Sequence, residues 1–210
     1  MTDYILDPVE IEKKSFEIIG ELLGDKKMDP KNSGVIKRVI HTTADFDYAD
    51  NLVFSEGAVG IALDLIKNGA NIVTDTQMAK AGINKKSLAA HNCQIHCFID
   101  SDEVAASAKE KGVTRSAVAV EYAASHLSSP LVFAVGNAPT ALLKLYELIT
   151  QNKCRPALVI AAPVGFVNVV EAKELIMGLD VPYIVAKGRK GGSNVAAAIC
   201  NALLYETIST

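Results

Sequence analysis

Short apolar runs alternate with amphipathic segments along most of this chain. From residue 70 onward, five short runs are mainly apolar, and the segments between them carry apolar residues every three or four positions. The first pattern is typical of buried strands and the second of helices that pack on a sheet. The sequence therefore predicts an α/β fold with a doubly wound, mostly parallel five-stranded sheet. The predicted strands are 71–74, 94–99, 130–135, 157–162 and 181–186.

An N-terminal helical extension is predicted ahead of this sheet. Residues 8–23 have the periodicity of a helix, and one face of it carries Ile11, Ser15, Ile18 and Leu22. After a polar loop, the β-branched residues Val39 and Ile40 predict a short strand that ends at His41. The imidazole of His41 is therefore predicted to lie at the polar end of a strand.

His41 is the first candidate for chemistry, because histidine is the side chain whose ordinary pKa lies near neutrality. Arg38 next to it would disfavour the protonated ring, and Asp45 and Asp47 would favour it. The alternative is a histidine with only a structural role at the end of an element.

The length and composition describe one folded unit. At 210 residues the chain can bury a large core, half of the residues are hydrophobic and 21% are charged. No repeat or linker divides it. We expect a single domain over residues 1–210, with the N-terminal helix and the His41 segment in 1–50 and the parallel α/β core in 51–210.

The charge and the cysteines favour a cytoplasmic protein. A net charge of -3 gives no bulk attraction to nucleic acid or to an anionic membrane. The N-terminus lacks the basic start and apolar run of a signal peptide, and no apolar stretch approaches the roughly 20 residues that span a bilayer. The spacing of the four cysteines is not that of a disulfide framework, so reduced thiols are expected.

Polar or glycine-rich loops follow four of the predicted strands, and parallel strands bring such loops to one edge of the sheet. The last loop adds three cations, Lys187, Arg189 and Lys190. Helix N-termini and cations at one edge favour a site for an anionic ligand, although each loop alone reads as an ordinary turn. None of the loops has a nucleotide-binding fingerprint. The loops are Asp75–Gln77, Gly136–Thr140, Pro163–Gly165 and Lys187–Ser193.

Three further features are ambiguous from the residues alone. The histidines and cysteines of 91–97 alternate to different faces of a predicted strand, so buried thiols explain them better than a metal site does, and no metal or cofactor is expected. Ser15 either bonds back to a carbonyl of its own helix or presents its hydroxyl to a ligand. Arg115 is either a surface charge or a clamp for a carboxylate.

Eight segments, spread in order over nearly the whole chain, resemble the precorrin-8X methylmutase (precorrin isomerase) family. The runs around His41 and from Val135 to Leu142 are the most specific. The segments are K-S-F-E-I-I (14–19), K-R-V-I-H-T-T-A-D-F (37–46), T-D-T-Q-M (74–78), G-I-N-K (82–85), T-R-S-A (114–117), V-G-N-A-P-T-A-L (135–142), P-V-G-F-V (163–167) and K-G-R-K-G-G-S (187–193).

The resemblance implies an isomerase, an intramolecular transferase that moves a methyl group between neighbouring carbons on ring C of a corrinoid in cobalamin biosynthesis. It implies that His41 is catalytic and that Ser15, Arg38 and Arg115 bind substrate. It also implies a homodimer with a Rossmann-like sheet. Lys187 and Arg189 are added as substrate-binding residues because the corrinoid carries several carboxylate arms.

The residues suit this chemistry, since a methyl shift on a conjugated macrocycle needs neither a redox agent nor a methyl donor. Protonation of a ring nitrogen by an imidazolium would make the migration favourable. A non-catalytic corrinoid carrier and a generic flavodoxin-like small-molecule-binding domain remain the alternatives. The T-T-A-D-F run after His41 favours cobalt-precorrin-8 as substrate, and no metal ligand set in the chain distinguishes it from precorrin-8X.

Overall fold

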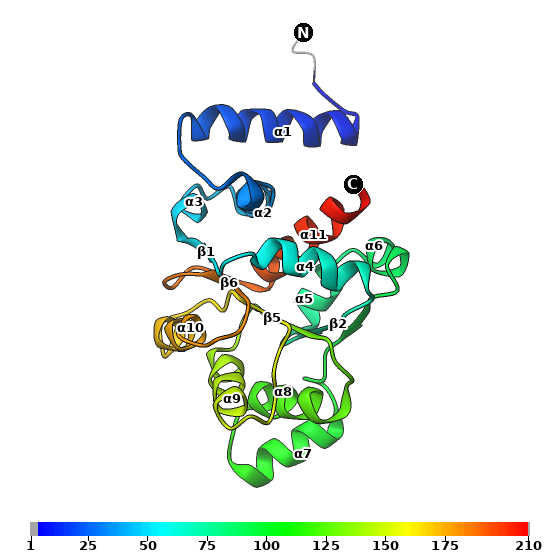
Figure 1. The fold of residues 1–210 in the computed structure, drawn as a ribbon, viewed down its shortest axis with the longest axis vertical. Coiled ribbons are helices and arrows are strands. Elements are labelled where there is room, and N and C mark those ends of the chain that lie inside the picture. Colours follow the sequence, from blue (N-terminus) through cyan, green and yellow to red (C-terminus); the bar gives the residue numbers. More distant parts are fainter. Residues whose placement is uncertain (1–3, 210) are drawn as a thin grey trace.

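A six-stranded sheet lies between layers of helices in the computed structural model of the chain, which describes residues 4–209 (Figure 1). Residues 1–3 and 210, at the two ends of the expected domain, lie outside the described residues. The strands are β1 (Leu52–Phe54), β2 (Asn71–Thr74), β3 (Gln94–His96), β4 (Leu131–Val135), β5 (Leu158–Ala161) and β6 (Tyr183–Ala186). The helices are α1 (Pro8–Leu23), α2 (Pro30–Thr43), α3 (Tyr48–Asn51), α4 (Ala58–Lys67), α5 (Gln77–Gly82), α6 (Lys85–Ala90), α7 (Asp102–Lys111), α8 (Arg115–His126), α9 (Pro139–Thr150), α10 (Val169–Met177) and α11 (Ser193–Ser209).

The five predicted strands are confirmed, and they pair in parallel. A sixth strand, β1, pairs antiparallel with β6 at one edge, and its three residues were too short a run to predict. The order across the sheet is β1-β6-β5-β4-β2-β3. From β2 the chain adds β3 on one side of the sheet, and it then adds β4, β5 and β6 on the other side. The strand order therefore reverses between β2 and β4. In open α/β sheets, ligands bind at the carboxyl ends of the two strands at such a reversal.

The central strands β4 and β5 are buried at every position, which explains why they read as continuous apolar runs. In β4, Val132 and Ala134 belong to the core beneath α4 and α11. Leu131, Phe133 and Val135 belong to the core on the other face, which α8, α9 and α10 cover.

The N-terminal helices form an outer layer over α11. Helix α2 packs on α11, and α1 lies across α2 at the margin of the molecule (Figure 1). The predicted bounds of α1 are confirmed, but the apolar face predicted from its periodicity is largely exposed: Ile11, Ile18 and Leu22 are 44%, 43% and 67% accessible. Ile19 is buried and anchors the helix.

The predicted strand at Val39 and Ile40 is wrong, because His41 lies in the last turn of α2. Signals for a helix were present in the sequence. Asp29 caps the N-terminus by accepting a hydrogen bond from the backbone N–H of Lys31, and Pro30 occupies the first turn, where its missing N–H costs nothing. The buried residues also have helical spacing: Val35, Ile36, Val39 and Ile40.

The loops that follow the parallel strands meet at the carboxyl ends of those strands, as predicted. The link between the first two is Asp75, whose side chain is only 4% exposed. Its carboxylate accepts hydrogen bonds of 2.7–2.8 Å from the backbone N–H groups of Gly136, Asn137 and Ala138, at the start of α9. Burial raises the pKa of Asp75, and these three donors oppose that shift. Asp75 therefore occupies the backbone N–H groups of the loop that leads into α9.

The last loop packs directly against the second. A Cβ atom at Gly136 would lie 2.6 Å from the Cα of Ser193, so the close approach requires glycine there. The Ser193 hydroxyl lies 2.7 Å from that of Thr76, next to Asp75. Side-chain and backbone contacts thus hold the loops after β2, β4 and β6 together.

We predict that Asp75→Asn lowers the free energy of unfolding by about 1–3 kcal/mol, because an amide nitrogen in place of one carboxylate oxygen leaves a buried N–H without an acceptor. Urea unfolding followed by circular dichroism measures this. The control is Asp64→Asn, at an exposed position of α4, with an expected change below about 0.5 kcal/mol. Equal stability of Asp75→Asn and wild type would contradict the role given to the carboxylate.

Candidate active site

His41 is exposed at the C-terminal end of α2, where the helix dipole interacts favourably with positive charge. Its ring stacks on the ring of Phe16 from α1, with centroids 5.4 Å apart and planes inclined by 20°. The contact fixes one face of the imidazole while the residue remains accessible to a ligand.

Arg38 lies one turn earlier on α2 and is held on three sides. Its guanidinium carbon is 4.7 Å from the centroid of the Phe16 ring and 4.9 Å from that of Tyr205 on α11. An ion pair with Glu12 from α1 completes the arrangement. Cation–π contacts and the ion pair therefore orient the cation toward α1.

A hollow of about 380 Å³ opens beside Arg38, between the N-terminal helices, α4 and α11. Ser15 of α1 is half-buried, and its hydroxyl donates a 2.8 Å hydrogen bond to the carbonyl of Ile11, the local bond that the sequence left open as an alternative. The hollow is lined by Phe16, Gly34, Arg38, Leu63, Ala202, Tyr205 and Glu206.

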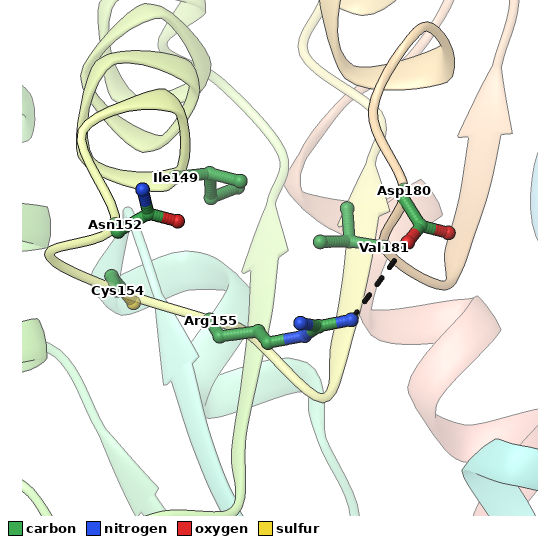
Figure 2. Close-up of a pocket in the computed structure, with 6 residues that line it drawn as sticks. All are labelled: Ile149, Asn152, Cys154, Arg155, Asp180 and Val181. Carbon is green, nitrogen blue, oxygen red and sulfur yellow. Dashed lines mark ion pairs between the residues drawn. The ribbon is translucent and has the colours of Figure 1, made fainter.

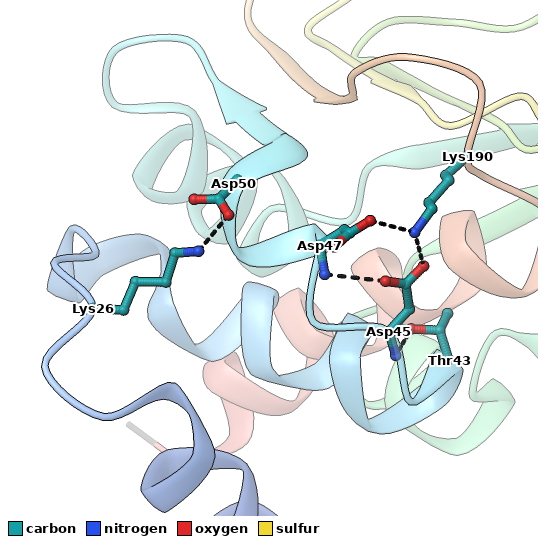
Figure 3. Close-up of polar contacts among 6 residues, drawn as sticks. All are labelled: Lys26, Thr43, Asp45, Asp47, Asp50 and Lys190. Carbon is teal, nitrogen blue, oxygen red and sulfur yellow. Dashed lines mark hydrogen bonds and ion pairs between the residues drawn. The ribbon is translucent and has the colours of Figure 1, made fainter.

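The cation loop, defined as residues 187–193, is tied to the end of α2 by Lys190. Its Nζ lies 2.6 Å from a carboxylate oxygen of Asp45 and 2.6 Å from one of Asp47 (Figure 3). Both carboxylates raise the pKa of Lys190, and Lys190 lowers the pKa of Asp45. The two acids expected to act on His41 are thus bound to the cation loop.

Lys187 and Arg189 extend from the same loop and are exposed. The guanidinium carbon of Arg189 lies 6.0 Å from the centroid of the Phe166 ring, which belongs to the loop after β5 and is itself 84% exposed. A cation and an accessible apolar ring therefore lie side by side at the sheet edge, an arrangement that suits an apolar ligand with carboxylate arms.

Arg115 stands apart from the residues above. It begins α8, on the face of the sheet opposite α11, and is exposed. The hydroxyl of Thr114 donates a 2.8 Å hydrogen bond to that of Thr140, which connects α8 to the start of α9. Arg115 therefore lies near the loop after β4, on the other side of the sheet from His41.

The candidate residues thus form two connected groups and one separate residue. His41, Arg38 and Ser15 belong to α1 and α2, and Lys190 joins that pair of helices to Lys187 and Arg189. Sequence reasoning missed the contacts of the Phe16 and Tyr205 rings with Arg38, and it missed the partner Glu12. Phe16 directly follows Ser15 in the K-S-F-E-I-I run, but nothing in the run indicates which ring contacts which cation.

A second hollow, of about 390 Å³, lies at the opposite edge of the sheet, ahead of β5 and β6 (Figure 2). Arg155 and Asp180 form a loose ion pair across it, with 3.8 Å between their closest atoms and both side chains largely exposed. None of its lining residues is a candidate named from the sequence.

The remaining histidines of the 91–97 segment bind other side chains. His96 Nε2 lies 3.0 Å from Asn71 Oδ1, and His91 Nε2 lies 2.9 Å from the hydroxyl of Thr207. Within residues 4–209, no three His, Cys, Asp or Glu side chains are grouped as metal ligands would be, and the four cysteines are free thiols. None of the helices over the same range has the length and apolar character needed to cross a membrane.

The comparisons with known proteins agree on the family. A family model described as precorrin-8X methylmutase matches residues 10–206. The cobalt-precorrin-8 methylmutase of Salmonella typhimurium is 44% identical over 207 residues, which cover 96% of this chain and 97% of that protein. The precorrin-8X methylmutase of Pseudomonas aeruginosa is 38% identical, covering 98% and 99%.

A solved structure shares the fold. The precorrin-8X methyl mutase of Thermus thermophilus superposes with a TM-score of 0.88 at 40% identity, covering 95% of this chain and 98% of that one. The resemblance carried by the eight sequence segments is therefore confirmed: this chain belongs to the precorrin-8X methylmutase family.

Proposed function

We propose that this protein is an isomerase that moves one methyl group between neighbouring carbons on ring C of a corrinoid, giving hydrogenobyrinate or cobyrinate in cobalamin biosynthesis, with His41 as the general acid. The observation that carries the proposal is the setting of His41: exposed, stacked on Phe16, at a helix C-terminus and one turn from Arg38. The reaction itself is inferred from membership of the precorrin-8X methylmutase family.

In this mechanism His41 donates its proton to a nitrogen of the conjugated ring system, which draws electrons toward that nitrogen and lowers the barrier to methyl migration. The proton returns to His41 when migration is complete. Substrate and product are isomers, so no group is gained or lost and no co-reactant is consumed.

The carboxylate arms of the corrinoid are bound by cations at two margins of the site and by Arg115, which stands apart from both. Arg38, oriented by two aromatic rings, serves the margin beside His41, where Ser15 also contacts substrate. Lys187 and Arg189 serve the margin at the sheet edge, and Arg115 contacts an arm that reaches the loop after β4. Guanidinium groups suit this task because they bind carboxylates with two parallel hydrogen bonds.

We predict that His41→Ala lowers kcat at least about a hundredfold, the contribution typical of a general acid, while the protein still binds cobyrinate. Absorbance spectra follow both conversion and binding. The matched control is His126→Ala at the end of α8, because His126 is also exposed and stacked on an aromatic ring, that of Tyr122. Wild-type turnover by His41→Ala would refute the assignment. Binding without a single-turnover absorbance change in the wild type would favour the carrier alternative.

We propose cobalt-precorrin-8 as the natural substrate. The support is the T-T-A-D-F run after His41, together with the 44% identity to the cobalt-precorrin-8 methylmutase of Salmonella typhimurium. Relatives of both descriptions are 34–38% identical to this chain, so identity alone does not choose between the two substrates. Parallel assays with cobalt-loaded and metal-free precorrin-8 should give the higher kcat/KM for the cobalt form. A preference for the metal-free form would reverse the assignment.

We also propose that the protein is a cytoplasmic homodimer and that residues 1–210 form one domain, divided into the segments 1–50 and 51–210. The packing of α2 on α11 and the bonds of Lys190 to Asp45 and Asp47 support the single domain. Four free thiols suit a reducing compartment. The exposed apolar face of α1 supports the dimer, because such faces are commonly covered by a partner.

For the dimer, we predict that Leu22→Glu on the exposed face of α1 produces monomers, because the new carboxylate would have to be buried in the contact. Sedimentation velocity measures the change. Val113→Glu, at an exposed apolar position between α7 and α8, is the control and should leave the dimer intact. A wild-type monomer, or a dimeric Leu22→Glu variant, would contradict this interface.

A further inference from the structure

A lysine side chain with no exposed surface lies beneath the cation loop. Lys173 of α10 is fully buried, in a row of apolar residues at helical spacing that comprises Val169, Ala172 and Ile176. A buried amine is costly unless hydrogen bonds replace those lost with water. The hydrogen-bond partners of Lys173 therefore indicate its structural role.

Both hydrogen bonds of Lys173 end on the backbone of the cation loop. Its Nζ donates to the carbonyl oxygens of Gly188 and Lys190 at 2.7 and 2.9 Å. Between them, the carbonyl of Arg189 accepts a 3.2 Å hydrogen bond from the backbone N–H of Gly165. Three successive carbonyls of the loop thus bind groups from the body of the protein, while the side chains of residues 187, 189 and 190 are exposed.

The Lys173 bonds add to other contacts that hold the loop, namely those of Lys190 with Asp45 and Asp47 and the backbone bond from Gly192 N–H to the carbonyl of Ala162. The sequence of the loop itself does little to fix its shape. Three of its seven residues are glycines, and Gly188 has a φ of 78°, in the left-handed region. Glycine-rich segments lose more conformational entropy on ordering than others do. An anchor from outside the loop compensates for that loss.

The amine can hold the loop in either protonation state. Burial lowers the pKa of Lys173 to about 8, and the neutral amine retains two N–H groups, the number that the two carbonyls need. Both hydrogen bonds to the loop can therefore form whether the amine is charged or neutral.

We propose that Lys173 is a positioning residue for the substrate's carboxylate arms. By binding the carbonyls of Gly188 and Lys190, it holds the cation loop in the conformation that presents Lys187 and Arg189 to those arms. The assignment of the ligand rests on the proposed function, whereas the anchoring of the loop is independent of it and can be measured without substrate.

The first measurement is limited trypsin digestion of the full chain, because the loop contains three trypsin sites, at Lys187, Arg189 and Lys190. Lys173→Met keeps the length of the side chain and removes its donors, and we expect cleavage within the loop at least about tenfold faster than in wild type. Lys173→Gln keeps an amide donor and should be intermediate. Lys109→Met, at an exposed position of α7, is the control and should match wild type.

The second measurement is steady-state kinetics together with titration of cobyrinate. We expect Lys173→Met to raise KM and the Kd of cobyrinate about tenfold, while kcat stays within about twofold of wild type, since His41 is untouched. Partial unfolding has a different signature, because it lowers the active fraction, and so the apparent kcat, without changing KM. If Lys173→Met does not fold, both measurements are made on Lys173→Gln.

Two results would overturn the proposal: loop cleavage in both Lys173 variants at the wild-type rate, or faster cleavage with KM and Kd unchanged. If the wild-type protein neither binds nor converts the corrinoid, the proposed function fails and the role in substrate positioning fails with it. The trypsin result then still decides whether Lys173 anchors the loop.

Discussion

The carboxylate of Asp75 governs where a ligand can bind on this fold. In open α/β sheets the crevice at the switch in winding, here between β2 and β4, is the usual place for an anion on backbone N–H groups. Here the protein's own carboxylate occupies those groups at Gly136, Asn137 and Ala138. These three N–H groups are therefore not available to an external anion. This agrees with the lack of a nucleotide fingerprint and disfavours a generic nucleotide-binding domain.

The centre of the parallel sheet could be predicted from sequence because burial on both faces leaves a strong signal, a short run with no polar position, as in β4 and β5. β1 left no such signal, since it is three residues long and only one of them is buried. The segment that ends at His41 was misinterpreted for a different reason. Val39 and Ile40 are β-branched, but their burial in the packing of α2 on α11 outweighs their intrinsic preference for strands.

The site was only partly predictable, because its residues are brought together by contacts between distant segments. The cations of the last loop could be identified from composition, yet the pairing of Lys190 with Asp45 and Asp47 spans more than 140 positions of the chain. The sequence does indicate that Lys173 is unusual, because it is a lysine on the apolar face of a helical pattern. What it binds is backbone, which has no sequence signature.

The ring of Phe16 belongs to α1, at the outer surface of the molecule, and packs on the residues of the proposed chemistry. Phe16 contacts both His41 and Arg38, and the helix that carries it is held mainly by α2 while its far side is uncovered. In the proposed homodimer, a partner on that side would contact the helix whose Phe16 ring packs on His41 and Arg38. Dissociation of that dimer on dilution would then change the setting of His41, and the specific activity would depend on the protein concentration.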